Sequence, residues 1–93
     1  MDFGQAIQAM KDGKAVAREG WNGKNMYIYL VYGSMPKAGK LRGQAFEHVG
    51  SKHPRGHDLI INPHIDMKAA DGSIVVGWLA SQTDMLSEDW VIV

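Results

Sequence analysis

Residues 26–32, MYIYLVY, contain only apolar and aromatic side chains, and this stretch constrains the fold more than any other part of the chain. A run of β-branched and aromatic residues predicts a β-strand. Successive side chains of a strand point to opposite faces of its sheet, so Ile28 and Leu30 share one face while Tyr27 and Tyr29 share the other. Both faces need cover from water. We therefore expect a central strand, or a strand whose second face meets another subunit.

The start of the chain has the pattern of a capped helix. Asp2 followed three residues later by Gln5 is a capping-box sequence, in which side chains satisfy amides of the first turn. Gly13 suits the left-handed position just after a helix end. Between them, apolar side chains recur at helical spacing, at Phe3, Ala6, Ile7 and Met10. These features predict one helix from about residue 3 to residue 12.

Apolar patterns predict four more strands, and they lie at residues 14–18, 64–68, 73–78 and 90–93. The pair Asp71 and Gly72 predicts a type I′ hairpin turn before the third of them. Ser81, three residues before Asp84, is a second capping-box sequence and predicts a short helix through about Ser87. The predicted class is α+β: a mainly antiparallel β-sheet with one N-terminal helix and one short C-terminal helix, in a single domain of residues 1–93.

The length of the chain limits how it is stabilised. A chain of 93 residues is near the lower end of what one hydrophobic core stabilises. It has no cysteine, which excludes disulfides and fits a reducing cytosol, so oligomerisation or a metal are the remaining supports. No apolar run approaches the roughly 20 residues that span a bilayer. The first residues lack a signal-peptide pattern. We expect no membrane segment and a protein that stays in the cytoplasm of the cell that makes it.

Charge is balanced over the chain but not along it. Ten basic and ten acidic side chains cancel, which argues against DNA as a partner because duplex-binding proteins carry a basic excess. Residues 34–58 show no periodicity, so we predict an irregular basic segment there. Between residues 34 and 57 its charges are Lys37, Lys40, Arg42, Lys52 and Arg55 against Glu47. Two interpretations stay open: a solvated basic loop, which is the commoner case, or local attraction for a small anion such as phosphate.

Recognisable catalytic motifs are missing from the sequence: it has no GxSxG elbow, no P-loop, no GxGxxG and no cysteine nucleophile. The candidate neutral-pH bases are His48, His53, His57 and His64. The first three lie in the irregular segment, where nothing else supports a metal site. Two of the three acids Asp84, Glu88 and Asp89 could form an acid pair, although carboxylates near a short helix usually serve capping and solubility. We predict no catalytic residue, no metal and no cofactor.

Aromatic residues favour a binding function. Three tryptophans in 93 residues are many for a small domain. Trp21 lies in a Gly/Asn turn, and Trp78 precedes a polar Ser-Gln-Thr-Asp stretch, an arrangement that suits a nucleobase or ribose. Core packing is the usual role of tryptophan, and we assign Trp90 to the core. Arg18 beside the turn would meet a phosphate in a bidentate manner. A surface ion pair with Glu19 or another acid explains Arg18 equally well.

Four stretches resemble the second Thoeris anti-defense family of phages and prophages. They are residues 14–24, which include REGWNGK, residues 63–68, residues 70–72 and residues 78–90, WLASQTDMLSEDW. These stretches cover both ends of the chain and leave out about residues 34–61. The combination is specific in so short a chain.

The resemblance implies a signal sponge. Members of that family bind the cyclic ADP-ribose-type signal that a bacterial TIR enzyme makes on infection, and they hold it without cleaving it. The resemblance implies a homotetramer in the infected host cell with ligand at subunit interfaces, and in some members cyclic dinucleotides in a second site. It implies that Trp21 and Trp78 form aromatic walls. It implies ribose contacts for Gln82, Thr83 and Asp84, and phosphate or ribose contacts for Arg18 and Asn22. The basic segment departs from the family pattern, which leaves the ligand isomer and the second site open.

Two other functions remain as alternatives. The chain could be a small phage structural or regulatory protein-interaction module, with its tryptophans buried against protein. It could also be a minimal nucleotide-processing enzyme that uses Asp84 or a loop histidine as base. A cyclic-nucleotide binding panel with analysis of the recovered ligand separates the three.

Overall fold

The computed structural model describes residues 1–54 and 58–93, which form two compact units. The first unit comprises Met1–Val31 and His64–Val93, and the second comprises Tyr32–Pro63. Arg55 and His57 of the predicted basic segment lie outside the described residues. A single domain of residues 1–93 stays a prediction.

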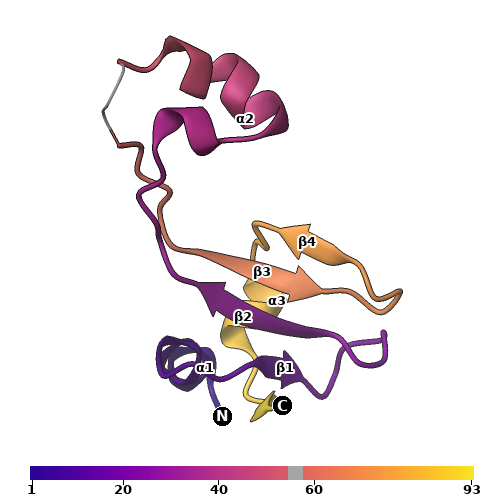
Figure 1. The fold of residues 1–93 in the computed structure, drawn as a ribbon. Helices are drawn as coiled ribbons and strands as arrows, with labels where there is room; N and C mark the ends of the chain where they lie inside the picture. Colours follow the sequence, from indigo (N-terminus) through magenta and orange to yellow (C-terminus); the bar gives the residue numbers. More distant parts are fainter. Residues whose placement is uncertain (55–57) are drawn as a thin grey trace. The chain divides into compact units, whose positions relative to one another are not determined.

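The first unit is built on an antiparallel sheet of five strands in the order β4-β3-β2-β1-β5 (Figure 1). The strands are β1 (Val16–Arg18), β2 (Tyr27–Val31), β3 (His64–Lys68), β4 (Ile74–Val76) and β5 (Trp90–Ile92). Each strand predicted from the sequence is present: β3 has the predicted bounds, and each of the other four is one to three residues shorter than predicted. The first and last strands of the chain order, β1 and β5, pair with one another, and this pairing brings residues 16–18 beside residues 90–92.

Two helices of the first unit begin at the capping boxes that the sequence predicts. In α1 (Phe3–Lys11), the Asp2 carboxylate accepts a hydrogen bond from the Gln5 amide at 2.8 Å, and Gly13 takes a left-handed φ of 89° just after the helix. In α3 (Gln82–Leu86), Ser81 and Asp84 form the second capping box. The predicted α+β class, with a mainly antiparallel sheet and these two helices, is confirmed.

The core lies between α1 and one face of the sheet. Helix α1 contributes Ala6, Ala9 and Met10, and the strands contribute Val16, Ile28, Met67 and Trp90. Trp90, the largest of the fully buried side chains, has no exposed surface, which confirms its assignment to the core. Burial on this scale supplies most of the stability of a small domain.

Strand β2 is central, as its composition predicts, with β1 on one side and β3 on the other. Ile28 on the core face is fully buried. On the opposite face Tyr27 and Tyr29 are half-buried, and their ring centroids are 6.3 Å apart. The Lys68 ammonium lies 5.5 Å from the centre of the Tyr27 ring. Neighbouring side chains of the sheet therefore cover part of this second apolar face.

The hairpin between β3 and β4 is present, but the predicted type I′ turn is wrong. A type I′ turn needs a positive φ at both central residues. Gly72 has a φ of 91°, whereas Asp71 is not among the described residues with positive φ. The Ala69 amide donates to the Ser73 carbonyl, so three residues form the loop and only the last is left-handed. The Asp71 carboxylate accepts from the Ser73 amide and hydroxyl, which stabilises this longer loop.

The second unit is not the irregular loop that the sequence suggests. It contains the 3-10 helices η1 (Ala38–Lys40) and η2 (Gly50–Lys52) and the α-helix α2 (Gly43–His48). A Cβ at Gly50 would lie 2.6 Å from the Ala38 carbonyl oxygen and 3.1 Å from the Phe46 ring, so close packing joins the three helices. These helices are too short to show a 3.6-residue period, which needs a window of about 11–18 residues.

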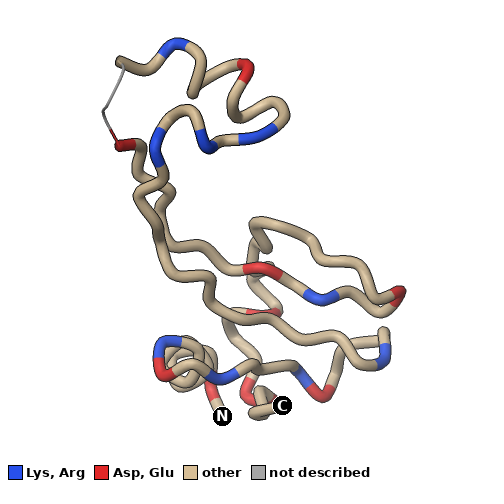
Figure 2. Tube along the Cα trace, viewed as in Figure 1, with Lys and Arg blue, Asp and Glu red and all other residues tan. Residues whose placement is uncertain are grey.

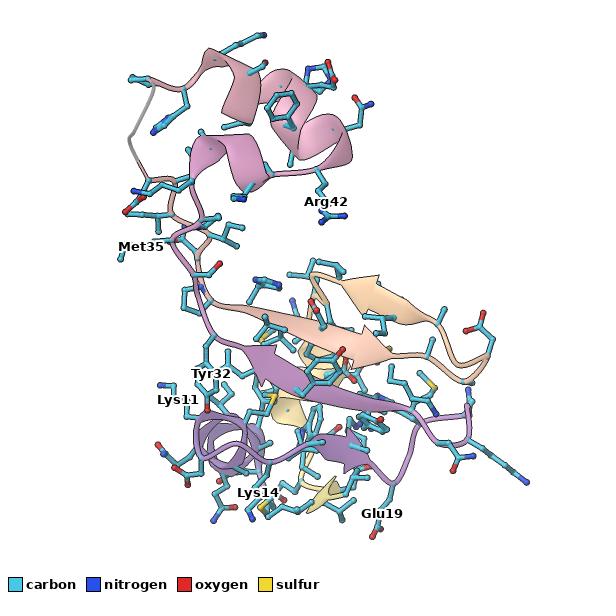
Figure 3. The ribbon with its side chains drawn as sticks, viewed as in Figure 1. Lys11, Lys14, Glu19, Tyr32, Met35 and Arg42 are labelled. Carbon is cyan, nitrogen blue, oxygen red and sulfur yellow. The ribbon has the colours of Figure 1, made fainter. Side chains whose placement is uncertain are left out.

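The charged residues of the second unit that the structure describes are exposed. The Lys37 ammonium pairs with Asp58 at 2.7 Å, with 63% and 42% of the two side chains exposed. Figure 2 shows the basic positions recurring along this unit. Arg42 projects away from the helices of its unit, and Met35 is exposed as well (Figure 3). The described part of the chain contains no helix with the length and apolar character needed to cross a membrane.

Candidate functional site

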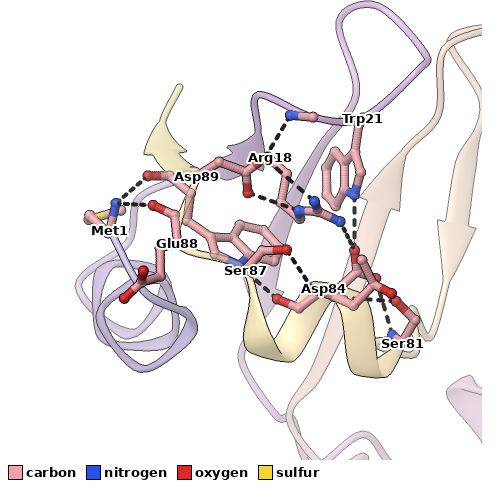
Figure 4. A network of polar contacts seen from close by, with 11 residues as sticks. Met1, Arg18, Trp21, Ser81, Asp84, Ser87, Glu88 and Asp89 are labelled. Atoms are coloured by element: carbon pink, nitrogen blue, oxygen red, sulfur yellow. Dashed lines mark hydrogen bonds and ion pairs between the residues drawn. The ribbon is translucent and has the colours of Figure 1, made fainter.

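The capping box of α3 fixes the position of Asp84. The Ser81 hydroxyl accepts from the Asp84 amide at 3.0 Å, and Oδ2 of Asp84 accepts from the Ser81 amide at 3.1 Å. A capping box satisfies two amides that a helix start otherwise leaves unpaired. This local geometry directs the other carboxylate oxygen, Oδ1, toward β1 and the turn that follows it (Figure 4).

Oδ1 of Asp84 joins three parts of the first unit. It accepts from Nη1 of Arg18 at 2.9 Å and from the indole Nε1 of Trp21 at 3.1 Å. The Arg18 and Asp84 side chains are each only 13% exposed. Three of the residues proposed from the sequence, Arg18, Trp21 and Asp84, are thus directly bonded to one another.

Asp89 joins Arg18, Trp21 and Asp84 and completes a cluster of four residues. It bonds Arg18 through guanidinium nitrogens that Asp84 does not use. Its Oδ1 accepts from Nε of Arg18 at 2.9 Å, and its Oδ2 accepts from the Gly20 amide at 2.8 Å. A longer contact of 3.5 Å joins Nη2 of Arg18 to Oδ2. The sequence suggests an acid pair or, more commonly, a capping or solubility role for Asp89, and it does not predict this contact with Arg18. Its only sequence signal is its place beside Trp90, at the start of a strand.

The charges of this cluster stabilise one another. Hydrogen bonds to Asp89 and then to Asp84 raise the pKa of Arg18. Burial acts to raise the pKa of Asp84, but hydrogen bonds from Arg18, the Ser81 amide and Trp21 hold it below the usual value of 3.8. The hydrogen bond from Arg18 is the main cause that lowers the pKa of Asp89. One cation faces two carboxylates, so at neutral pH the cluster is negative by one charge.

Three tryptophans, Trp21, Trp78 and Trp90, pack against one another beside the cluster. The centroid of the Trp21 ring lies 5.4 Å from that of Trp90 at 80°, and Trp78 lies 6.3 Å from Trp90 at 82°. Trp21 and Trp78 are 6.2 Å apart at 65°. Edge-to-face aromatic pairs of this kind stabilise a fold by more than the burial of their surface area alone. Trp90 is fully buried and supports two partly buried rings, Trp21 and Trp78, which the sequence analysis paired as aromatic walls.

Comparison with known proteins now decides the family. The model of the Thoeris anti-defense 2-like domain matches residues 1–93. The chain is 39% identical to Thoeris anti-defense 2 of Bacillus phage SP01, over 100% of this chain and 94% of that protein. The chain belongs to the Thoeris anti-defense 2-like family. The resemblance noted in the sequence is therefore confirmed, and the family gives the class of function as anti-defense.

The other residues proposed for this family member lie at the edges of the cluster. Gln82 and Thr83 are exposed in the first turn of α3, next to Asp84. Asn22 is exposed in the turn that carries Trp21. The same turn contains Asn25, which has a left-handed φ of 60°, a conformation that asparagine tolerates. The predicted turn is present, with its left-handed residue at Asn25.

His48 and His64 each have a polar partner on their own element. His48 contacts Oε1 of Gln44 at 2.8 Å in α2, and His64 lies 3.6 Å from Oδ1 of Asp66 in β3. Across residues 1–54 and 58–93, no three His, Cys, Asp or Glu side chains gather into a possible metal site. His57 lies outside those ranges.

Proposed function

We propose that this protein sequesters a TIR-derived cyclic ADP-ribose-type immune signal without cleaving it, and so blocks the Thoeris defense of an infected bacterium. Family membership supports the anti-defense part of this proposal. The observation that carries the binding part is the pair of partly buried tryptophans, Trp21 and Trp78, beside the exposed polar first turn of α3. The protein would act in the host cytoplasm.

Aromatic support is what a nucleobase requires. Stacking of one base on an aromatic ring contributes about 1–3 kcal/mol. Trp21 and Trp78 both rest on the fully buried Trp90, so neither ring has to be ordered when a base arrives. Preordered contacts lose less entropy on binding, which favours a tight complex.

Hydrogen bonding to ribose is assigned to the start of α3. An ionised carboxylate has about four acceptor positions, and Asp84 uses three of them within the chain, for Arg18, Trp21 and the Ser81 amide. About one position on Oδ2 is left for a ribose hydroxyl. Gln82 and Thr83 are exposed and supply further donors and acceptors.

We assign the phosphate contacts to groups in and beside the turn that carries Trp21. Asn22 is exposed and offers its amide. Arg18 retains N–H groups that its two acid partners do not use, but its charge is already matched by Asp84 and Asp89. An indirect role therefore suits Arg18 better than a first contact with the pyrophosphate.

Assembly into a homo-oligomer, most simply a tetramer, belongs to the same proposal. Every side chain of the edge strand β4 is exposed: Ile74 by 60%, Val75 by 45% and Val76 by 71%. Residues 73–77 contain no charge or proline, the features that usually protect a free sheet edge. At the opposite edge Met1 bonds β5, because its ammonium donates to the Trp90 carbonyl at 2.7 Å and its carbonyl accepts from the Trp90 amide at 3.1 Å.

The assembly is tested by light scattering with a matched pair of variants. The parent should have a mass that is a multiple of 10.3 kDa. Val76→Lys should lower that mass, because a lysine on the β4 edge opposes strand pairing. Ile92→Lys makes the same chemical change on β5 and should leave the mass unchanged. A monomeric parent would overturn the assembly.

The binding function is tested by recovering the ligand. The protein is incubated with the cyclic ADP-ribose product of a purified TIR enzyme, washed and denatured, and the released material is analysed by mass spectrometry. Intact ligand supports a sponge. Altered ligand would make the protein an enzyme, and no ligand would favour a protein-interaction module. The same assay with cyclic dinucleotides tests the second ligand class.

A further inference from the structure

We infer that Asp89, which the sequence does not mark as a site residue, is the positioning residue that holds the Trp21 turn in its binding orientation. The inference rests on the proposed function in one respect, namely that Trp21 contacts the ligand. Asp89 would act through Arg18 and Gly20 and would not itself touch the nucleotide.

Asp89 accepts hydrogen bonds from two successive backbone amides of the turn, those of Glu19 and Gly20. Its Oδ2 accepts from the Gly20 amide at 2.8 Å, and its main-chain carbonyl accepts from the Glu19 amide at 3.1 Å. The Trp21 amide then donates to the Arg18 carbonyl at 3.3 Å, which closes the turn. Gly20, the residue directly before Trp21, is therefore bonded to a charged acceptor on the residue that precedes β5, a stronger bond than one between neutral groups.

Gly20 shows how close this contact is. A Cβ at this position would lie 2.7 Å from Oδ2 of Asp89 and 3.2 Å from Nη2 of Arg18. The φ of Gly20 is not positive, so the glycine is required by the approach of Asp89 and not by backbone conformation. Any side chain at position 20 must displace the carboxylate or the guanidinium.

The ring of Trp21 is fixed separately from its backbone. Asp84 accepts from the indole Nε1 at 3.1 Å, and Arg18 bridges Asp84 and Asp89 with two hydrogen bonds of 2.9 Å. Asp84 therefore orients the ring, while Asp89 orients the turn from which the ring projects. Two-point support of this kind is what keeps a contact residue in one productive orientation.

A double-mutant cycle tests this route. Asp89→Ala should weaken capture of the purified TIR product by up to about tenfold, because the Trp21 turn must then be ordered when the ligand binds. In a Trp21→Ala background the same change should have almost no effect, because residues that act through one another are not additive. Glu88→Ala, which removes the same charge one residue earlier from an exposed side chain, should leave affinity unchanged in both backgrounds. Additive effects of Asp89→Ala and Trp21→Ala would overturn the inference.

A second measurement needs no ligand and separates this inference from the proposed function. The heteronuclear NOE of the Trp21 indole Nε1–H reports motion of the ring on the ps–ns timescale. Its value should fall in Asp89→Ala and in Gly20→Ala, and should stay at the parent value in Glu88→Ala. If Asp89→Ala does not fold, Asp89→Asn serves, since it keeps the shape and removes the charge. An unchanged Trp21 signal in a folded Asp89 variant would overturn the positioning role, whether or not the parent binds a cyclic nucleotide.

Discussion

The cluster around Arg18 and the second unit both concentrate charge, but they use it in opposite ways. Arg18 and Asp84 are each only 13% exposed, and their polar atoms bond each other and the backbone. Lys37 and Asp58 of the second unit form their ion pair with 63% and 42% of their side chains exposed. Partly buried charges hold one geometry because an unpaired partner is costly there. Exposed pairs contribute little to stability and act mainly through their long-range field.

The comparison predicts large effects for the core beneath the cluster. Trp90→Ala should lower the free energy of unfolding by about 3–5 kcal/mol, because it removes a fully buried indole and leaves a cavity. Thermal unfolding followed by circular dichroism measures this. Leu79→Ala, at a side chain that is 90% exposed, is the control and should stay within about 0.5 kcal/mol of the parent. A normally stable Trp90→Ala that fails to bind would mean that Trp90 is a ligand contact.

The second-largest effects should be on the affinity of the protein for the TIR product. Trp21→Ala and Trp78→Ala should each weaken capture of the TIR product by at least about tenfold, because each loses a stacking surface of about 1–3 kcal/mol. Asp84→Ala should do the same, since it removes a ribose acceptor and the bond to the Trp21 indole, and the oligomer should persist. Isothermal titration calorimetry measures the affinities. Parent-like binding by Trp21→Ala would remove that residue from the site.

Acid should remove the stabilisation that Asp84 and Asp89 give to the cluster. The pKa values of Asp84 and Asp89 lie below their usual value of 3.8. A lowered pKa in the folded state stabilises the protein above pH 3.8, and this stabilisation is lost as pH falls through the folded pKa values. The urea midpoint should therefore drop as pH falls below about 4, and the drop should be smaller in Asp89→Asn. An equal drop in both proteins would contradict this account.

The smallest effect is expected for the exposed charges. Replacing Lys37, Lys40 and Arg42 by serine should change the free energy of unfolding by no more than about 0.5 kcal/mol per site. If these charges attract the ligand, the triple variant should capture it more slowly at about 0.01 M salt and equally fast at about 1 M, where screening shortens the field to roughly 3 Å. Stopped-flow fluorescence measures the rates. A slow variant at both salts would show that the three side chains act by contact and would weaken the contrast between the two regions.

Local patterns in the sequence determined most of the first unit. Asp2 with Gln5, and Ser81 with Asp84, predicted both helix starts, because a capping box involves residues only three positions apart. The apolar stretch around Ile28 predicted a central strand, since both of its faces need cover. The tryptophans and the motifs around them identified the family. The short helices of the second unit escaped prediction because each is too short for a period and depends on packing around Gly50.

Only the tertiary structure decided how the site is held together. Arg18 and Asp89 are 71 positions apart in the chain, and Trp21 and Asp84 are 63 apart. Which carboxylate meets Arg18 depends on the pairing of β1 with β5, and a strand pairing between distant segments is not written in any local pattern. The sequence by itself supplied the residues that we propose to bind a nucleotide. The sheet order decided that two of them, Arg18 and Asp84, also support Trp21, and that Asp89 joins them.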